Sequence, residues 1–164
     1  MSIARVGLVA ALPALCGFAG GLLGGRFSDT LLRRGYSLTF ARKTPIVLGM
    51  LLSRAMILCN YAGSTWQAVA VMCVAFFGKG IGALGWTVVS DTSPKEIMGL
   101  SGGLFNTFGN MAAITTAIVI GYLVKGTGGF SAALVFVGAS ALGAVICYLG
   151  VVGEIKRLEL REPI

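Results

Sequence analysis

The sequence contains no histidine, and only six of its 164 residues are acidic. Its four cysteines lie in four different apolar runs, and no two of them have the spacing of a metal site; they are Cys16, Cys59, Cys73 and Cys147. We therefore expect no metal centre and interpret the cysteines as small apolar residues. The chain also lacks a Gly-x-Ser-x-Gly elbow, a P-loop and a His-Glu-x-x-His motif, which argues against an enzyme and against a bound cofactor.

Charge is scarce as well, since 12% of the residues are charged, 56% are hydrophobic and the mean hydropathy is +0.89. About 20 apolar residues are needed to cross roughly 30 Å of hydrocarbon as a helix. Five runs reach that length, and little chain remains outside them. The sequence therefore predicts an all-α, polytopic transmembrane protein in a lipid bilayer, with spans at about 3–24, 45–62, 66–89, 99–124 and 130–152.

The net charge of +7 would suggest a nucleic-acid partner in a soluble protein, but here the positions of the basic residues favour a membrane and no nucleic acid. Nine basic residues fall on one side of the predicted spans and two on the other. The first group is Arg26, Arg33, Arg34, Arg42, Lys43, Lys95, Lys156, Arg157 and Arg161; the second is Arg5 and Lys125. Positive residues accumulate on the cytoplasmic side, so we expect the N terminus outside, a basic cytoplasmic loop at 26–44 and the C terminus inside.

An odd number of spans is unusual for a protein that works by pairing equivalent halves. Met1 also leads almost directly into the first span. Both features favour a chain cut from a longer helical array.

Four polar or amphipathic residues interrupt the third and fourth apolar runs: Lys79, Trp86, Asn106 and Asn110. A lysine at mid-depth in a bilayer costs a few kcal/mol or more. Lys79 and Trp86 are seven residues apart, and Asn106 and Asn110 are four apart, so each pair is expected to share one helix face. A short polar turn, residues 90–96, which includes Asp91, joins these two runs, and counting about 1.5 Å per residue from it places Trp86 and Asn106 about 8 to 15 Å deep.

These side chains suit a polyhydroxylated carboxylate, because an amide donates to and accepts from hydroxyls and an indole offers a flat face and one N–H donor. Each also has a structural interpretation. Trp86 would anchor at an interface, Asn106 and Asn110 would bond between helices, and Lys79 would extend its charge towards water. Arg54, in the second run, is either a pocket charge or a peculiarity of this sequence. No acidic residue lies deep in a span, so the chain carries no obvious proton relay.

Glycines recur every four residues in several runs, as in Gly17, Gly21 and Gly25, in Gly20 and Gly24, in Gly78 and Gly82, and in Gly99 and Gly103. Small residues on one face let helix backbones approach closely. Either this is ordinary helix packing, or the helices slide past each other during gating.

The first polar loop carries a glycine, an acid four residues later and a basic run, with a second basic pair after an insertion: Gly25, Asp29, Arg33, Arg34, Gly35, Arg42 and Lys43. This pattern resembles the cytoplasmic signature loop of the major facilitator superfamily. Taken alone, these charges also fit an ordinary positive loop with Asp29 as a helix-end cap. The resemblance implies a gate in which Asp29 pairs with arginines when the cytoplasmic side is closed.

The segments 82–86, 90–96, 99–110 and 153–160 together resemble the anion:cation symporter family, and within it the bacterial carriers of glucarate, galactarate and galactonate. The match extends over nearly the whole chain and corresponds to helices 8 to 12 of a twelve-helix carrier. It implies a fragment of a proton-coupled sugar-acid transporter of the cell inner membrane. It also implies that Trp86 and Asn106 contact the sugar acid, and that the partners are this anion, a coupling proton and the missing N-terminal helices.

An alternative of another class is a small membrane channel or structural subunit that assembles with other chains. A stable, symmetric homo-oligomer in detergent would favour this alternative.

Overall fold

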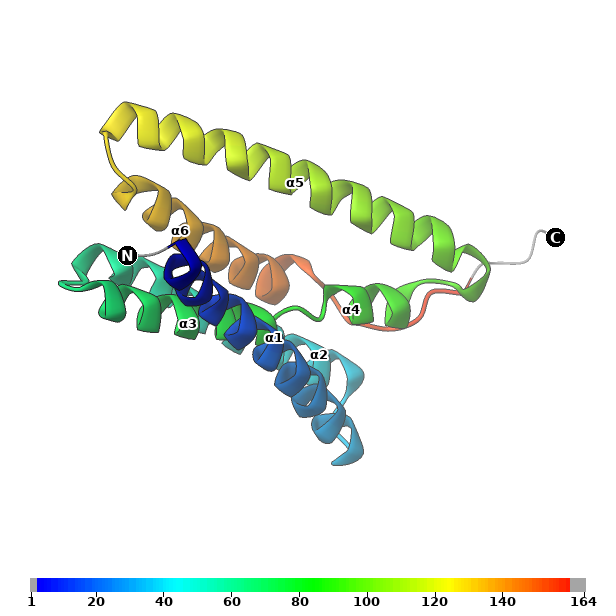
Figure 1. Ribbon diagram of the computed structural model, residues 1–164. Helices are drawn as coiled ribbons and strands as arrows, with labels where there is room; N and C mark the ends of the chain where they lie inside the picture. Colours follow the sequence, from blue (N-terminus) through cyan, green and yellow to red (C-terminus); the bar gives the residue numbers. More distant parts are fainter. Residues whose placement is uncertain (1–2, 160–164) are drawn as a thin grey trace.

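A computed structural model describes residues 3–159, with side chains from residue 7 onward, and these residues form helices without strands. Figure 1 shows one long helix, α5, lying along one edge, while α1, α2 and α3 cross one another on the opposite side. The helices are α1 (Ile3–Arg33), α2 (Leu38–Ser53), α3 (Thr65–Ile81), α4 (Gly85–Thr92), α5 (Met98–Thr127) and α6 (Ser131–Ile146). Short 3₁₀ segments occupy Arg54–Tyr61 and Lys95–Ile97, and one π turn occupies Cys147–Val151.

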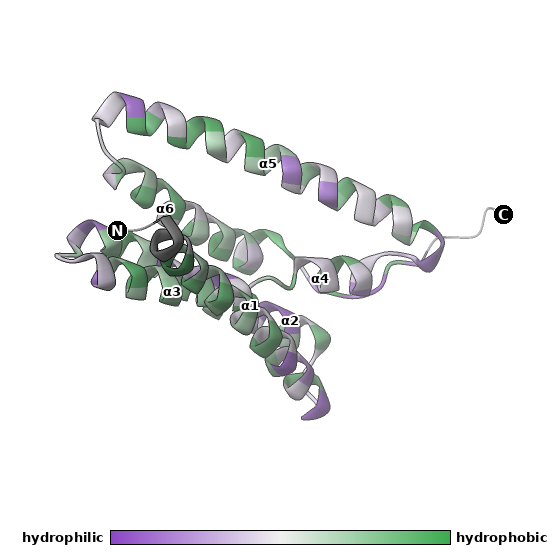
Figure 2. Cartoon of the chain, viewed as in Figure 1, coloured by the Kyte–Doolittle hydropathy of each residue, from purple (hydrophilic) through white to green (hydrophobic). Residues whose placement is uncertain are grey.

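Five helical stretches within the described residues are long and apolar enough to cross a membrane: Gly7–Arg33, Leu38–Tyr61, Thr65–Thr92, Lys95–Thr127 and Ser131–Val151. In Figure 2 hydrophobic colouring runs along most of these helices, and hydrophilic colouring lies where α1 ends and α2 begins and at a few places along α5. Large apolar side chains such as Leu8, Phe108 and Tyr122 are exposed, as expected for a surface that faces lipid. The predicted all-α, multi-pass architecture is therefore confirmed.

The predicted loop over 26–44 is wrong in its extent, because α1 continues to Arg33 and α2 begins at Leu38. The turn between them is fixed by backbone geometry. Gly35 has a φ of +83°, its N–H donates to the Leu32 carbonyl, and the Tyr36 N–H donates to Leu31, which is a Schellman ending. The Ser37 side chain then accepts from the Phe40 N–H and caps α2.

Charges alone do not end a helix, and this is why the loop was predicted too long. Arginine and lysine are good helix formers. Arg33 therefore lies in the last turn of α1, and Arg42 and Lys43 lie in the first turns of α2.

The third predicted span is broken into two helices. Helix α3 ends at Ile81 and α4 begins at Gly85, with Gly82 ending the first helix and Leu84 starting the second. Glycines at 80, 82 and 85 weaken helix propagation at this point. The second span changes character too, from α-helix to 3₁₀ at Arg54.

Helices α1 and α3 pack backbone to backbone through glycine. A Cβ added at Gly20 would overlap the Phe77 carbonyl, and one at Gly24 would lie 2.8 Å from the Ile81 Cα. Gly78 meets Gly49 of α2 in the same way, with 2.7 Å between its added Cβ and the Gly49 carbonyl oxygen. Gly20, Gly24, Gly49 and Gly78 therefore serve close packing of these three helices.

Helix α5 is packed very differently. Along its membrane-length stretch no residue is buried, and its neighbours are α4, α6 and the short turn that precedes it. An added Cβ at Gly99 or Gly103 would meet nothing within 4 Å, so this glycine pair serves no close contact in the described part of the chain.

Candidate functional site

Trp86 connects α4 to α5. It is the second residue of α4 and is 55% exposed. Its ring meets the Phe105 ring of α5 edge to face, with the centroids 5.0 Å apart. A Cβ added at Gly102 of α5 would lie 3.2 Å from the Trp86 Cζ3 atom. The indole therefore rests on α5 and keeps part of its surface free.

Asn106 lies beside this contact. It follows Phe105 directly and is four residues from Gly102, so it shares the α5 face on which the Trp86 ring rests. Its side chain is exposed. The structure thus brings an indole and a free amide to neighbouring positions on adjacent helices.

Asn110 is one turn further along α5 and is also exposed. Its Nδ2 donates to the backbone oxygen of Asn106 at 2.9 Å. One donor of this amide is therefore used within α5, and this bond differs from the bond between helices that the structural interpretation predicted for Asn110.

Lys79 is not placed on a common helix face with Trp86, as its spacing had predicted. The helix ends at Ile81, between the two residues, and α4 starts afresh at Gly85. The Lys79 Nζ lies 5.8 Å from the centre of the Phe76 ring on its own helix. The 3.6-residue periodicity on which the prediction relied does not continue across the break.

Arg54 stands at the start of the 3₁₀ segment and is exposed. It lines a surface hollow with apolar neighbours that include Leu51 and Leu58. The structure groups it with none of the four predicted binding residues.

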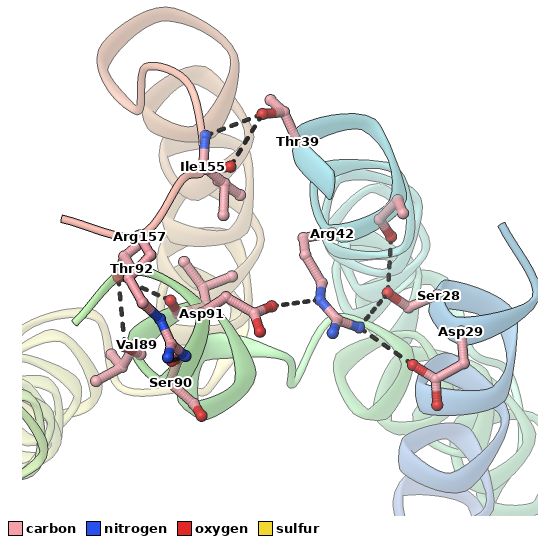
Figure 3. A network of polar contacts seen from close by, with 12 residues as sticks. Ser28, Asp29, Thr39, Arg42, Val89, Ser90, Asp91, Thr92, Ile155 and Arg157 are labelled. Carbon is pink, nitrogen blue, oxygen red and sulfur yellow. Dashed lines mark hydrogen bonds and ion pairs between the residues drawn. The ribbon is translucent and has the colours of Figure 1, made fainter. Parts of the chain in front are cut away.

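A second cluster lies at the basic end of the molecule and is centred on Arg42. Figure 3 shows its guanidinium between α1 and α4. Nε donates to Asp91 Oδ2 at 2.7 Å, and Nη1 donates to Asp29 Oδ1 at 3.3 Å. Nη1 also donates to Ser28 Oγ at 2.8 Å, and that hydroxyl donates to the Ala41 carbonyl. One buried arginine therefore joins three helices.

The two carboxylates in this cluster are unequal. The Asp29 side chain is 62% exposed, whereas that of Asp91 is 22% exposed and lies closer to Arg42. A sheltered, charge-assisted bond is stronger than a solvated one, so Asp91 is the main partner. Sequence reasoning had assigned Asp91 only to a polar turn. The available signal was a second acid on the basic side of the predicted spans.

The other residues of the predicted gating loop take different places. Arg33 and Arg34 are exposed, and among the residues that the structure describes neither pairs with a carboxylate. Lys43 Nζ donates to the Val152 carbonyl, beyond the last helical turn. An added Cβ at Gly25 would meet nothing within 4 Å. Arg42, Asp29 and Lys43 are therefore the members that join different segments.

One predicted binding residue, Trp86, shares the short helix α4 with Asp91 of the charge cluster. Trp86 lies at the start of α4 and Asp91 near its end, five residues or about 7.5 Å apart along the axis. A shift of α4 moves both. The helix α4 therefore links the exposed indole to the ion-pair cluster at the basic end.

Comparison with known proteins gives relatives over nearly the whole chain. The chain is 67% identical over 162 residues to the "Probable galactarate/D-glucarate transporter GudP" of Bacillus subtilis (strain 168), and the match covers 99% of this chain and 36% of that protein. The "Probable galactarate/D-glucarate transporter GarP" of Escherichia coli (strain K12) matches with the same identity and coverage. The "D-galactonate transporter" of Escherichia coli O6:H1 is 41% identical over 154 residues, which is 94% of this chain and 36% of that protein.

The chain therefore spans about a third of the length of these relatives, 36% in each case. The family profile of the Major Facilitator Superfamily matches residues 1–162, which is almost all of the sequence. Together with the five membrane-length helical stretches, this match shows that the chain belongs to the Major Facilitator Superfamily.

Proposed function

We propose that this chain works within a longer secondary transporter that takes up a sugar-acid anion, such as galactarate, D-glucarate or galactonate, together with a proton. The observation that carries the proposal is the 67% identity, over 99% of the chain, to transporters named for galactarate and D-glucarate. Transport would proceed by alternating access, with the substrate held between two repeats of the carrier.

In this proposal Trp86 and Asn106 contact the sugar acid directly. The indole offers a flat apolar face and one N–H donor, and the amide donates to and accepts from the substrate hydroxyls. Both side chains are exposed on the α4 and α5 surface, so a second surface can close over them. That surface would come from helices outside residues 1–164.

Lys79 and Asn110 have supporting parts in the proposal. The exposed Lys79 ammonium would attract the substrate carboxylate towards the site by its charge. Asn110, bonded to the Asn106 backbone oxygen, would keep this turn of α5 in place.

The charge cluster would act as the gate on the basic side. Arg42 bridges Asp29 on α1 and Asp91 on α4 across long sequence separations, so both ion pairs exist only while these helix ends are close. Separating the ends breaks the pairs and lets water solvate the charges. We assign the state described here to a closed basic side.

In this proposal the basic end faces the cytoplasm of a bacterial inner membrane, with the N terminus outside and the C terminus inside, because positive residues accumulate on the cytoplasmic side. The described spans hold no acidic residue at mid-depth, since Asp29 and Asp91 lie near helix ends. The carboxylates that couple transport to a proton would therefore come from the other helices of the carrier.

Uptake of labelled galactarate into membrane vesicles tests the proposal. The complete carrier should accumulate it, and accumulation should collapse when a protonophore removes the proton gradient. Vesicles that contain residues 1–164 alone should bind weakly and accumulate none, because half of the site is missing. Accumulation by residues 1–164 alone would contradict the proposal. A stable, symmetric homo-oligomer that conducts ions would favour a small channel instead.

A further inference from the structure

The segment after the last helical turn, residues 152–159, has no regular secondary structure and yet is held in place. Ile155 is 3% exposed. Its neighbours Glu154 and Lys156 form a surface ion pair with 70% of each side chain exposed. An extended segment with one buried apolar residue and solvated flanks is docked onto the helices at that residue.

The first docking point is the beginning of α2. Thr39 Oγ1 accepts from the Ile155 N–H at 2.9 Å and also lies 3.5 Å from the Ile155 carbonyl oxygen, to which it donates. Four residues further along α2, Lys43 Nζ donates to the Val152 carbonyl. One face of α2 therefore holds the segment at two points.

The second docking point is the end of α4. The Leu158 N–H donates to the Thr92 carbonyl at 2.9 Å, and Arg157 Nη2 donates to the Ser90 carbonyl at 3.0 Å. The last carbonyls of a helix lack partners within it. The segment satisfies two of them and places a cation at the negative end of the α4 dipole.

These contacts connect α2 and α4, two helices that do not pack directly against each other. Within the described part of the chain, α2 and α4 share no extended backbone contact. The Arg42 to Asp91 ion pair bridges the two helices, and residues 152–159 bridge them beside that pair, as Figure 3 shows. Helix α4 is only eight residues long and is bounded by non-helical residues on both sides, so its position depends on such bridges.

We propose that residues 152–159 form a clasp that positions α4 against α2, with Thr39, Ile155 and Arg157 as its positioning residues. The clasp holds Asp91 within reach of Arg42 and thereby fixes Trp86, five residues away on the same helix. Release of the clasp frees α4 to shift, which opens the ion pair and moves the indole together. The consequence of this release for transport rests on the proposed function. The positioning of α4 by residues 152–159 is independent of that function.

Hydrogen–deuterium exchange of the 164-residue chain in lipid nanodiscs tests the clasp. Thr39→Val removes the hydroxyl that binds Ile155 and should speed exchange of the amides of residues 88–92 about fivefold, the effect of one lost hydrogen bond on a local opening. Thr39→Ser keeps the hydroxyl and should restore slow exchange. Lys156→Ala, on an exposed residue of the same segment, is the matched control and should exchange as the parent chain does.

Ile155→Ala provides a second, independent release of the clasp and should speed exchange over the same residues. Unchanged exchange at 88–92 in both Thr39→Val and Ile155→Ala would overturn the proposal. Faster exchange that extends equally to the α1 to α3 contact would overturn it too, because it would indicate general loosening. Since exchange does not depend on any substrate, a failure of the complete carrier to transport galactarate would contradict only the proposed function.

Discussion

Helices α1 and α3 meet through glycines with their backbones in contact, whereas α5 meets α4 through one pair of aromatic rings and leaves its length exposed. The first contact has no room for a methyl group, and an added Cβ at Gly80 would overlap the Gly17 carbonyl. The second brings side-chain atoms rather than backbone close: an added Cβ at Gly85 would lie 2.7 Å from the Phe105 ring, and one at Gly102 would lie 3.2 Å from the Trp86 ring. The difference separates a rigid part of the chain, α1 to α3, from an open part, α4 and α5, that carries the proposed binding residues.

The largest expected effect comes from adding a methyl group to the rigid part. Gly80→Ala should lower the free energy of unfolding by about 3 kcal/mol, the upper end of overpacking costs, because backbone atoms on both sides must move. Unfolding in denaturant after purification in detergent would measure it. Gly103→Ala, on the open face of α5, is the control and should be neutral or slightly stabilising. Equal effects would erase the distinction between the two parts.

The next effect concerns the bridge between the two parts. Arg42→Ala removes charge-assisted bonds to Asp91, Asp29 and Ser28 and should cost about 2 kcal/mol of unfolding free energy. Arg33→Ala, at an exposed arginine in the last turn of α1, should leave unfolding unchanged. If both variants unfold like the parent chain, the cluster does not join α4 to the rigid part.

A smaller effect is expected inside the open part. A double-mutant cycle on Trp86→Ala and Phe105→Ala should give a coupling of about 1 kcal/mol, as for other edge-to-face pairs. A double-mutant cycle on Trp86→Ala and Phe108→Ala, at an exposed residue of α5, should give no coupling energy. A coupling near zero for Phe105 would mean that the rings do not hold α5 to α4.

The smallest effect on stability should come from the two asparagines. Asn106 and Asn110 are both exposed on α5. The variants Asn106→Ala and Asn110→Ala should therefore have the same free energy of unfolding as the parent chain. In the complete carrier they should differ in galactarate affinity. Asn106→Ala should weaken it about tenfold through the loss of paired substrate hydrogen bonds, and Asn110→Ala much less. Calorimetric titration would separate them, and a larger loss at Asn110 would reverse their roles.

The membrane architecture could be predicted because hydropathy reports the solvent directly: the five spans agree with the observed stretches in number and order. The predicted ends of these spans agree less well with the ends of the observed helices. The Schellman turn at Gly35 and the break at Gly82 to Leu84 depend on backbone geometry and on close neighbours, which hydropathy does not report. This is why the loop was predicted too long and Lys79 was placed on one face with Trp86.

The neighbourhood of Trp86 and Asn106 could be predicted in part, because counting from the same polar turn predicts similar depths for both. The Asp91 partner of Arg42 and the docking of Ile155 on Thr39 could not. These contacts join residues 49 and 116 positions apart. No local pattern encodes a pairing at such separations without the fold.

We propose that the open surface of α4 and α5 binds the sugar acid, and substitution of Trp86 removes the aromatic contact on which this proposal depends. The matched control is Trp66, which is 62% exposed against 55% for Trp86 and lies at the start of α3. In the complete carrier, Trp86→Ala should weaken galactarate binding about tenfold or more, and Trp66→Ala should leave it unchanged. Equal affinity in both variants would contradict the account.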